Sequence, residues 1–243
     1  MDAAVLRDDM VDSLEHESKA CVRSEAVSVA MREVPRHEFV DDQRGAYADR
    51  PFQRFGTRVL APSTVGRLYE LLAPEADDSV LVVGVGVGYT AAVAAEMAGS
   101  RNVHAIDITR KLVYEARENL SAAGYDEVLV DCRDGADGLP EYAPYDRILV
   151  EAAAVSPPRA LLDQLADDGT LVMPHGNHEQ ELAVVDAAGA IERHGTCAFA
   201  PLLVDGEEAG SVERNRTHRE DREFAKRDAR RKRGWELDWI DWD

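Results

Sequence analysis

The sequence predicts an α/β fold in which a doubly wound, mostly parallel sheet ends in an antiparallel hairpin. From residue 79 onward, short apolar runs alternate with amphipathic segments, the order expected of strands and helices in such a sheet. Glycines stand directly between the first apolar run and the first helix, and two apolar runs around a tight turn close the pattern. With 243 residues, the chain has room for one such domain with accessory elements.

The N-terminal residues 1–56 predict helices and loops. One of these helices ends at Pro35 and has apolar residues at helical spacing, namely Val27, Ala30, Met31 and Val34. The segment 45–62 predicts a loop rich in arginine and aromatic residues. An amphipathic helix is expected to follow over 64–72, with a core face of Val65, Leu68 and Leu72.

The alternating region predicts five strands, at 79–83, 102–106, 127–131, 147–150 and 170–173. Two helices are expected between them, at 89–97 and, with Thr109 as the N-cap residue, at 109–122. Pro157 and Pro158 are expected to open another helix. The closing hairpin is predicted from 181–185 and 190–192, around a turn at 187–189.

The composition excludes several classes of protein. Acidic residues outnumber basic ones by 47 to 28, and the net charge of −19 argues against a surface that binds nucleic acid or anionic membranes throughout. Only four of the basic residues are lysine, and an acidic, lysine-poor surface is typical of salt-adapted cytoplasmic proteins. Three cysteines without a C-x-x-C pair predict neither a disulfide framework nor a metal site. The acidic N-terminus and short apolar runs predict no signal peptide and no membrane span.

The glycine loop indicates a cofactor that contains a nucleoside. Gly84, Gly86 and Gly88 follow the first strand of the alternating region, where glycine permits a tight turn and a close approach to a ligand. Asp107 ends the next strand, where a carboxylate can accept hydrogen bonds from both ribose hydroxyls. Residues 86–91 also match the dinucleotide pattern G-x-G-x-x-A, so a nicotinamide cofactor and a turn without ligand both remain open.

Three further features favour S-adenosyl-L-methionine as the cofactor. Asp134 and Gly135 follow the third strand, where methyltransferases place an acid against the adenine amino group. The strand at 145–150 leads to the place of the acceptor. The closing hairpin suits a methyltransferase better than a dehydrogenase, in which a second parallel half would follow.

Several segments then resemble the protein-L-isoaspartate O-methyltransferases, which methylate isomerised aspartyl residues and so begin their repair. The resemblance spans about 25–205, and its segments are 30–40, 46–51, 83–99, 119–125, 133–154, 161–176 and 180–186. It implies a Rossmann-like class I methyltransferase fold and, with the acidic composition, a haloarchaeal type of the family. The resemblance assigns the methionine end of the cofactor to the three loop glycines, its ribose to Asp107, and its adenine to Asp134 with Gly135.

The acceptor motif departs from the family pattern. Arg58 replaces the family threonine, Leu60 replaces the serine, and Ser63 stands where histidine is frequent. Arg58 can bind an acceptor carboxylate bidentately, bind the carboxylate of the cofactor, or be a solvated loop residue. Val82 replaces an acid that the family places two residues before the first glycine, and Glu151 replaces a threonine at a strand end facing the cleft.

Three regions are predicted: an N-terminal helical and substrate-loop region at 1–62, a methyltransferase domain at 63–213, and a charged tail at 214–243. Residues 214–233 contain ten basic and four acidic residues, whereas 234–243 contain four acids and all three tryptophans, Trp235, Trp239 and Trp242. The tryptophans would share one helix face, which favours docking on the protein itself or on a second subunit. The basic segment leaves nucleic acid as a partner of the tail alone.

Three functions fit these observations. The first is methylation of a damaged protein or peptide substrate. The second is methylation of RNA or a small molecule, with the basic tail as a guide. The third is cofactor binding without isoaspartyl activity, because the family threonine and serine are missing. His175 and His178 have no third ligand nearby in the sequence and predict a polar loop, so no metal is expected.

Overall fold

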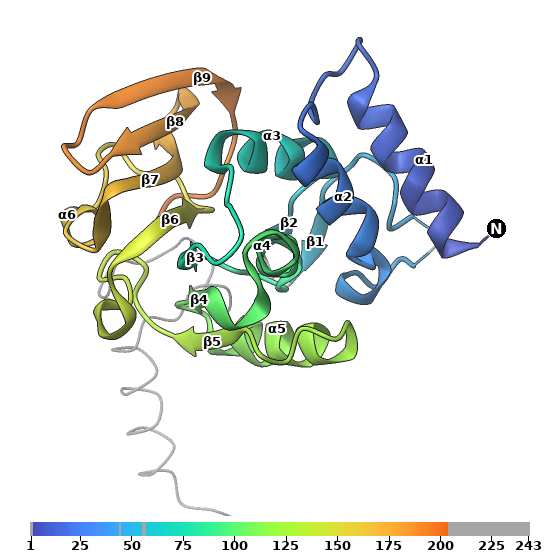
Figure 1. The fold of residues 1–243 in the computed structure, drawn as a ribbon, viewed down its shortest axis with the longest axis horizontal. Coiled ribbons are helices and arrows are strands. Elements are labelled where there is room, and N and C mark those ends of the chain that lie inside the picture. The colour runs from blue at the N-terminus through green and yellow to red at the C-terminus, as the bar shows by residue number, and fades with distance from the viewer. Residues whose placement is uncertain (1, 44, 55–56, 204–243) are drawn as a thin grey trace, which may run out of the picture.

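The computed structural model describes residues 2–43, 45–54 and 57–203. Its centre is a seven-stranded sheet with the order β5-β4-β3-β6-β7-β8-β9 (Figure 1). The strands from β5 to β7 in this order pair in parallel, and β8 and β9 are antiparallel additions at one edge. The predicted α/β class with its closing hairpin is therefore confirmed.

The strands of this sheet are β3 (Val80–Val83), β4 (Val103–Asp107), β5 (Leu129–Cys132), β6 (Tyr145–Val150), β7 (Leu165–Gly176), β8 (Gln180–Asp186) and β9 (Ile191–Cys197). The length predicted for the fifth strand is wrong, because β7 begins at Leu165 rather than at Thr170. Asp167, Asp168 and Gly169 interrupt the first half of this strand, so no apolar run marks its start in the sequence.

The helices are α1 (Ala3–Glu15), α2 (Glu25–Glu33), α3 (Pro62–Leu72), α4 (Tyr89–Ala98), α5 (Arg110–Ala122) and α6 (Arg159–Leu162). Three 3-10 turns lie between the helices and strands: η1 (Arg36–Phe39), η2 (Ser100–Asn102) and η3 (Pro140–Tyr142). In Figure 1, the helices α1 to α5 lie to one side of the sheet, and α6 lies beyond β7 on the other. The helix predicted after Pro158 is thus confirmed, although it is a single turn.

Both faces of the central strands are buried. Val80 and Val82 of β3 belong to the core shared with α1 to α5, whereas Leu81 and Val83 belong to a second core that includes Leu161 of α6. A strand covered on both faces needs apolar residues at every position, which explains the continuous run VLVV. This packing on both faces fixes the carboxyl end of β3, where the glycine loop begins.

The segment 45–62 contains a small antiparallel hairpin, so the loop predicted there is wrong. Its strands are β1 (Phe52–Arg54) and β2 (Thr57–Val59), paired to each other and separate from the main sheet. Strands of three residues with arginines in both give no alternating apolar signal. Arg54 forms ion pairs with Glu115 of α5 and with Asp41, which fix the hairpin against the body.

No helix in the described ranges is long and apolar enough to span a membrane. The tail predicted at 214–243, with its basic segment and three tryptophans, lies outside the described residues, as does the end of the region 63–213.

Candidate functional site

A cavity lies at the carboxyl ends of β3, β4 and β6, the edge at which parallel sheets bind ligands. It brings together residues from the predicted glycine loop, the next strand and the third strand. Its lining residues are Thr57, Val83, Gly84, Asp107, Ile108, Thr109, Leu112, Gly135, Glu151, Ala152, Ala200, Pro201, Leu202 and Leu203.

The glycine loop carries the chain from β3 into α4. Gly84 and Gly88 have φ angles of +83° and +97°, a region that residues with a Cβ rarely adopt. A Cβ at Gly88 would also lie 3.1 Å from Leu120 Cγ of α5, so this glycine permits close packing of the helices. The N–H of Gly84 donates to Ile106 O at 2.8 Å, which ties the loop to β4. The start of the loop, at Gly84, therefore lines the cavity, whereas Gly88 is buried against α5.

Asp107 is a buried acid at the end of β4. Its Oδ2 accepts the N–H of Gly86 at 3.1 Å and its Oδ1 accepts the N–H of Thr109 at 2.8 Å. Burial raises the pKa of Asp107 to about 6, against these hydrogen bonds, which lower it. Each carboxylate oxygen keeps a second lone pair, so the group can still accept hydrogen bonds from a diol.

Asp134 and Gly135 follow β5 and are both buried. Asp134 Oδ1 accepts the N–H of Ala136 at 2.9 Å, which orients the carboxylate. A Cβ at Gly135 would lie 2.6 Å from Val83 Cγ1, so only glycine fits there without displacing β3. This close approach forms the wall of the cavity beside the second core.

Glu151 lies directly after β6 and lines the same cavity. Its Oε1 is buried and has no hydrogen-bond partner among the described residues. Burial, together with the charge of nearby Asp107, raises the pKa of Glu151 to about 8, while the Thr90 hydroxyl opposes the shift. The sequence placed this acid at a strand end facing the cleft, but it did not indicate an unsatisfied carboxylate.

The three predicted acceptor residues lie outside the described lining of the cavity. Arg58 is exposed on β2, and the alternation of the strand turns its neighbour Thr57 to the cavity instead. Leu60 packs partly buried against the core, and its carbonyl accepts from Arg36 Nη2 at 2.8 Å. Ser63, in the first turn of α3, donates its N–H to Asp49 at 3.0 Å. Sequence reasoning missed Thr57 because it did not predict the hairpin.

These features agree with a protein family. Residues 7–208 match the model of the protein-L-isoaspartate(D-aspartate) O-methyltransferases. The chain belongs to this family. The resemblance stated from the sequence is thereby confirmed, and with it the assignment as a methyltransferase that depends on S-adenosylmethionine. The nicotinamide alternative for the glycine loop is no longer supported.

Named relatives show how far the similarity extends. The chain is 44% identical over 212 residues to the protein-L-isoaspartate O-methyltransferase of Methanopyrus kandleri, which covers 83% of this chain and 92% of that protein. It is 39% identical over 206 residues to the enzyme of the same name from Methanosarcina mazei, covering 82% and 83%. Both alignments span most of either chain, so the similarity is not confined to the glycine loop.

A solved structure shows the same fold. A protein-L-isoaspartate O-methyltransferase of Plasmodium falciparum, crystallised in complex with S-adenosyl-L-homocysteine, superposes with a TM-score of 0.73 at 20% identity. The match covers 81% of this chain and 98% of that one. The arrangement of the sheet and its helices in this methyltransferase is therefore shared with an enzyme of remote sequence.

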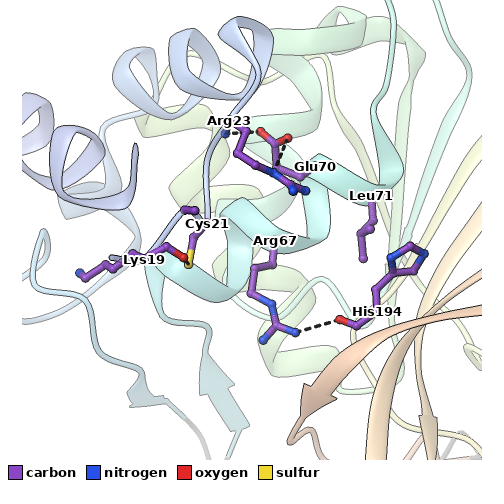
Figure 2. A pocket seen from close by; sticks show the side chains of 8 residues that line it. Lys19, Cys21, Arg23, Arg67, Glu70, Leu71 and His194 are labelled. Atoms are coloured by element: carbon purple, nitrogen blue, oxygen red, sulfur yellow. Dashed lines mark hydrogen bonds and ion pairs between the residues drawn. The ribbon is translucent and has the colours of Figure 1, made fainter. Parts of the chain in front are cut away.

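A second cavity of the methyltransferase lies between α3, β9 and the segment before α2, with a volume of about 340 Å³. Figure 2 shows Glu70 joined to Arg23 and Arg67 joined to His194. Glu70 accepts hydrogen bonds from the N–H groups of Arg23 and Ser24, both at 2.8 Å. Arg67 donates to the carbonyls of His194 and Thr196, each at 3.2 Å. These contacts link the N-terminal region to the antiparallel edge of the sheet.

His175 and His178 line a third cavity at the turn between β7 and β8. In the described part of the chain, no group of three or more histidine, cysteine, aspartate or glutamate side chains is arranged to hold a metal ion.

Proposed function

We propose that this chain transfers the methyl group of S-adenosylmethionine to the free carboxylate of an isoaspartyl residue in a damaged protein. The observation that supports it is the row of groups at the carboxyl ends of neighbouring strands: Asp134 after β5, Asp107 on β4, and the glycine loop after β3. An extended nucleoside cofactor fits such a row, because adjacent strands are about 4.8 Å apart.

The proposed placement follows the chemistry of each group. Asp134 accepts from the adenine amino group, and Asp107 accepts from the ribose hydroxyls. Gly84 lines the cavity beside the methionine end, where a Cβ at this position would stand 3.7 Å from the Cβ of Glu151, and Gly86 and Gly88 shape the turn that follows. The orphaned Oε1 of Glu151 suits a ligand with positive charge.

When bound, the cofactor supplies a methyl group on a sulfonium, and in-line attack by a carboxylate oxygen forms the methyl ester while the C–S bond breaks. The acceptor is already ionised, so the protein has no proton to remove and its task is to orient the acceptor and exclude water. The hairpin β1–β2 forms the wall from which Thr57 enters the cavity. We propose that the Thr57 hydroxyl donates to the acceptor carboxylate, in place of the missing family serine.

Arg58 has a different proposed role. Its side chain is exposed on the neighbouring position of β2, where a guanidinium can attract the carboxylate of an approaching peptide. Leu60 and Ser63 are proposed to shape the loop through their backbone contacts. The region 1–62 would thus supply the acceptor side of the site and the remaining domain the cofactor side.

The test is transfer of label from S-adenosylmethionine to an isoaspartyl peptide, scored as a base-labile ester, with the matched aspartyl peptide as the control. We expect ester on the isoaspartyl peptide alone. Absence of ester while cofactor binding is intact would show that the acceptor is of another class. If the double variant Arg58→Thr/Leu60→Ser then gained the activity, the altered acceptor motif would be the cause.

We also propose that the enzyme works in a salt-rich cytoplasm. Support comes from the excess of 47 acidic over 28 basic residues and from the use of only four lysines. Raising KCl from low to molar concentration is expected to increase both the melting temperature and the rate of ester formation. A fall in both quantities would contradict salt adaptation.

A further inference from the structure

Glu151 lies on the same face of the sheet as the glycine loop. Val82 of β3 pairs with Leu149 of β6, and both side chains belong to the core shared with α1 to α5. Two residues further along each strand stand Gly84 and Glu151, which therefore share this face. The N–H of Glu151 donates to Val83 O at 2.8 Å, so the ladder still holds the backbone at this point. The carboxylate thus extends over the start of the loop from a fixed position.

The surroundings of Glu151 provide no positive charge among the described residues. The charge of Asp107, at the end of β4, raises the pKa of Glu151, and the charge of Glu151 raises the pKa of Tyr69 of α3. Both of these neighbours are acids. Tyr69 donates its hydroxyl to Thr90 O at 2.6 Å and so is engaged elsewhere. A buried carboxylate oxygen without a partner is costly, and such a group in a native protein calls for an explanation. A cationic ligand that pairs with this oxygen would be such an explanation.

The order of the strands shows which part of the cofactor reaches Glu151. Along the row β5-β4-β3-β6, the relevant residues are Asp134, Asp107, Gly84 and Glu151. Two strand spacings, about 10 Å, separate the ends of β4 and β6. With adenosine over β5 and β4, the amino-acid part of the cofactor lies over β3 and β6. That part carries an α-ammonium group.

We propose that Glu151 binds the α-ammonium group of the methionine part of the cofactor. This inference rests on the proposed function, which orients the adenosine. Val82, two residues before Gly84 on the same face of β3, is apolar and fully buried, so β3 itself places no acid on this face near its end. Glu151 therefore supplies the anionic contact for the charged end of the cofactor.

Binding of a cation changes the proton occupancy of Glu151. In the free protein, burial keeps the carboxyl largely protonated at neutral pH, because its pKa is about 8. An ammonium group at hydrogen-bond distance favours the ionised form, so the carboxyl loses its proton to the buffer as the ligand binds. A carboxylate that only fills space would release nothing.

The experiment is calorimetric titration at pH 7 in two buffers of different ionisation enthalpy. The ligands are S-adenosylhomocysteine, which has the α-ammonium group, and methylthioadenosine, which lacks the whole amino-acid part. For the wild type we expect release of about 0.9 proton per S-adenosylhomocysteine and none per methylthioadenosine. Glu151→Gln should abolish the release and weaken S-adenosylhomocysteine about 10- to 100-fold, with methylthioadenosine unchanged. The matched variant Asp107→Asn should weaken both ligands.

Three outcomes would overturn the inference or its basis. Unchanged proton release in Glu151→Gln would show that another group titrates. Equal weakening of both ligands in this variant would show that Glu151 has a structural role. Either result would overturn the inference and leave the proposed function standing. Failure of the wild type to bind either ligand would overturn the proposed function and the inference together. The melting temperature of each variant shows whether it is folded.

Discussion

Two of the charged cavities in the described part of the chain, the one at the glycine loop and the one between α3 and β9, differ in how their charges are satisfied. In the cavity at the glycine loop, Asp107 is buried and Glu151 is half-buried with a buried Oε1, and burial raises the pKa of each. In the cavity between α3 and β9, Glu70 accepts from Arg23 and from Ser24. Burial raises the pKa of Glu70 as well, but these hydrogen bonds more than offset it, and the net pKa lies below the usual value.

This difference in hydrogen bonding is what we expect between a ligand-binding site and a contact that only stabilises the fold. A charge that already has its protein partners gains little from a ligand, because binding would have to replace those contacts. A buried acid without a cation nearby gains the full pairing when a cationic ligand arrives. We therefore expect the cofactor in the cavity at the strand ends rather than in the cavity whose lining Figure 2 shows.

The largest expected effect is a difference in pH dependence. The folded protein keeps the proton of Glu151 up to a pH of about 8, whereas the unfolded chain releases it near 4.5, so the free energy of unfolding falls as pH rises through this window. Since each pKa unit corresponds to about 1.4 kcal/mol, Glu151→Gln should be more stable than the wild type at pH 9 by a few kcal/mol. Urea unfolding at constant salt, without cofactor, measures the difference.

Glu70→Gln is the matched control, with the opposite sign. The lowered pKa of Glu70 stabilises the fold above the usual pKa of 4.5, and this contribution is lost as pH falls through the folded pKa. The variant should therefore be less stable than the wild type at pH 7 to 9, and the difference should shrink in acid. Parallel pH curves for the wild type and Glu151→Gln would remove the distinction between the two cavities.

The next effect concerns Asp107. Asp107→Asn keeps the shape but removes the charge, and charge-assisted hydrogen bonds are about twice as strong as neutral ones. We expect about 100-fold weaker binding of S-adenosylhomocysteine, equivalent to roughly 2.7 kcal/mol, with the melting temperature unchanged or higher. Equilibrium titration and thermal unfolding measure the two quantities. Unchanged affinity would mean that Asp107 is not the ribose ligand.

In the cavity between α3 and β9, a substitution should lower the stability and leave the cofactor affinity unchanged, the reverse of Asp107→Asn. Glu70 Oε1 also accepts from the hydroxyl of Ser24, the N-cap residue of α2, at 2.9 Å, so Glu70→Ala leaves the N–H groups and the hydroxyl just before α2 without their acceptor. We expect a loss of about 2 kcal/mol of stability and no change in cofactor affinity. Lys19→Ala, which breaks an ion pair with Asp49 at the surface, serves as the control and should cost about 0.5 kcal/mol or less. A loss of cofactor affinity in Glu70→Ala would contradict the structural role.

Three of the six residues that the sequence assigned to the cofactor line one cavity, because their placement depends on local features. Glycines after an apolar strand and an acid at the end of the next one have few alternative placements in a parallel sheet. The structure accordingly places Gly84, Asp107 and Gly135 around one cavity. The sequence did not predict that Glu151 Oε1 lacks a hydrogen-bond partner, nor that β7 starts at Leu165, because both features depend on neighbours distant in the sequence.

The acceptor side could not be predicted, because it depends on a hairpin of six strand residues fixed by tertiary contacts. Arg54 reaches Glu115 of α5 across the fold, and such an ion pair leaves no local trace in the sequence. Once β2 is a strand, its alternation decides that Thr57 faces the cavity while Arg58 is exposed. The family pattern assigns an acceptor role to position 58, whereas the cavity is lined by its neighbour Thr57.

The smallest expected effect follows from this exchange. Thr57→Val removes the hydroxyl and keeps the shape, so kcat/KM for an isoaspartyl peptide should fall about tenfold, the value of one hydrogen bond to a charged group. Thr57→Ser should keep most of the activity, and cofactor affinity should not change in either variant. Arg58→Ala should lower kcat/KM less, and more at low salt than at high salt, because an exposed charge acts at long range. If instead Arg58→Ala had the larger effect at every salt concentration, the guanidinium would be the acceptor ligand, and the hairpin would have to rotate on substrate binding.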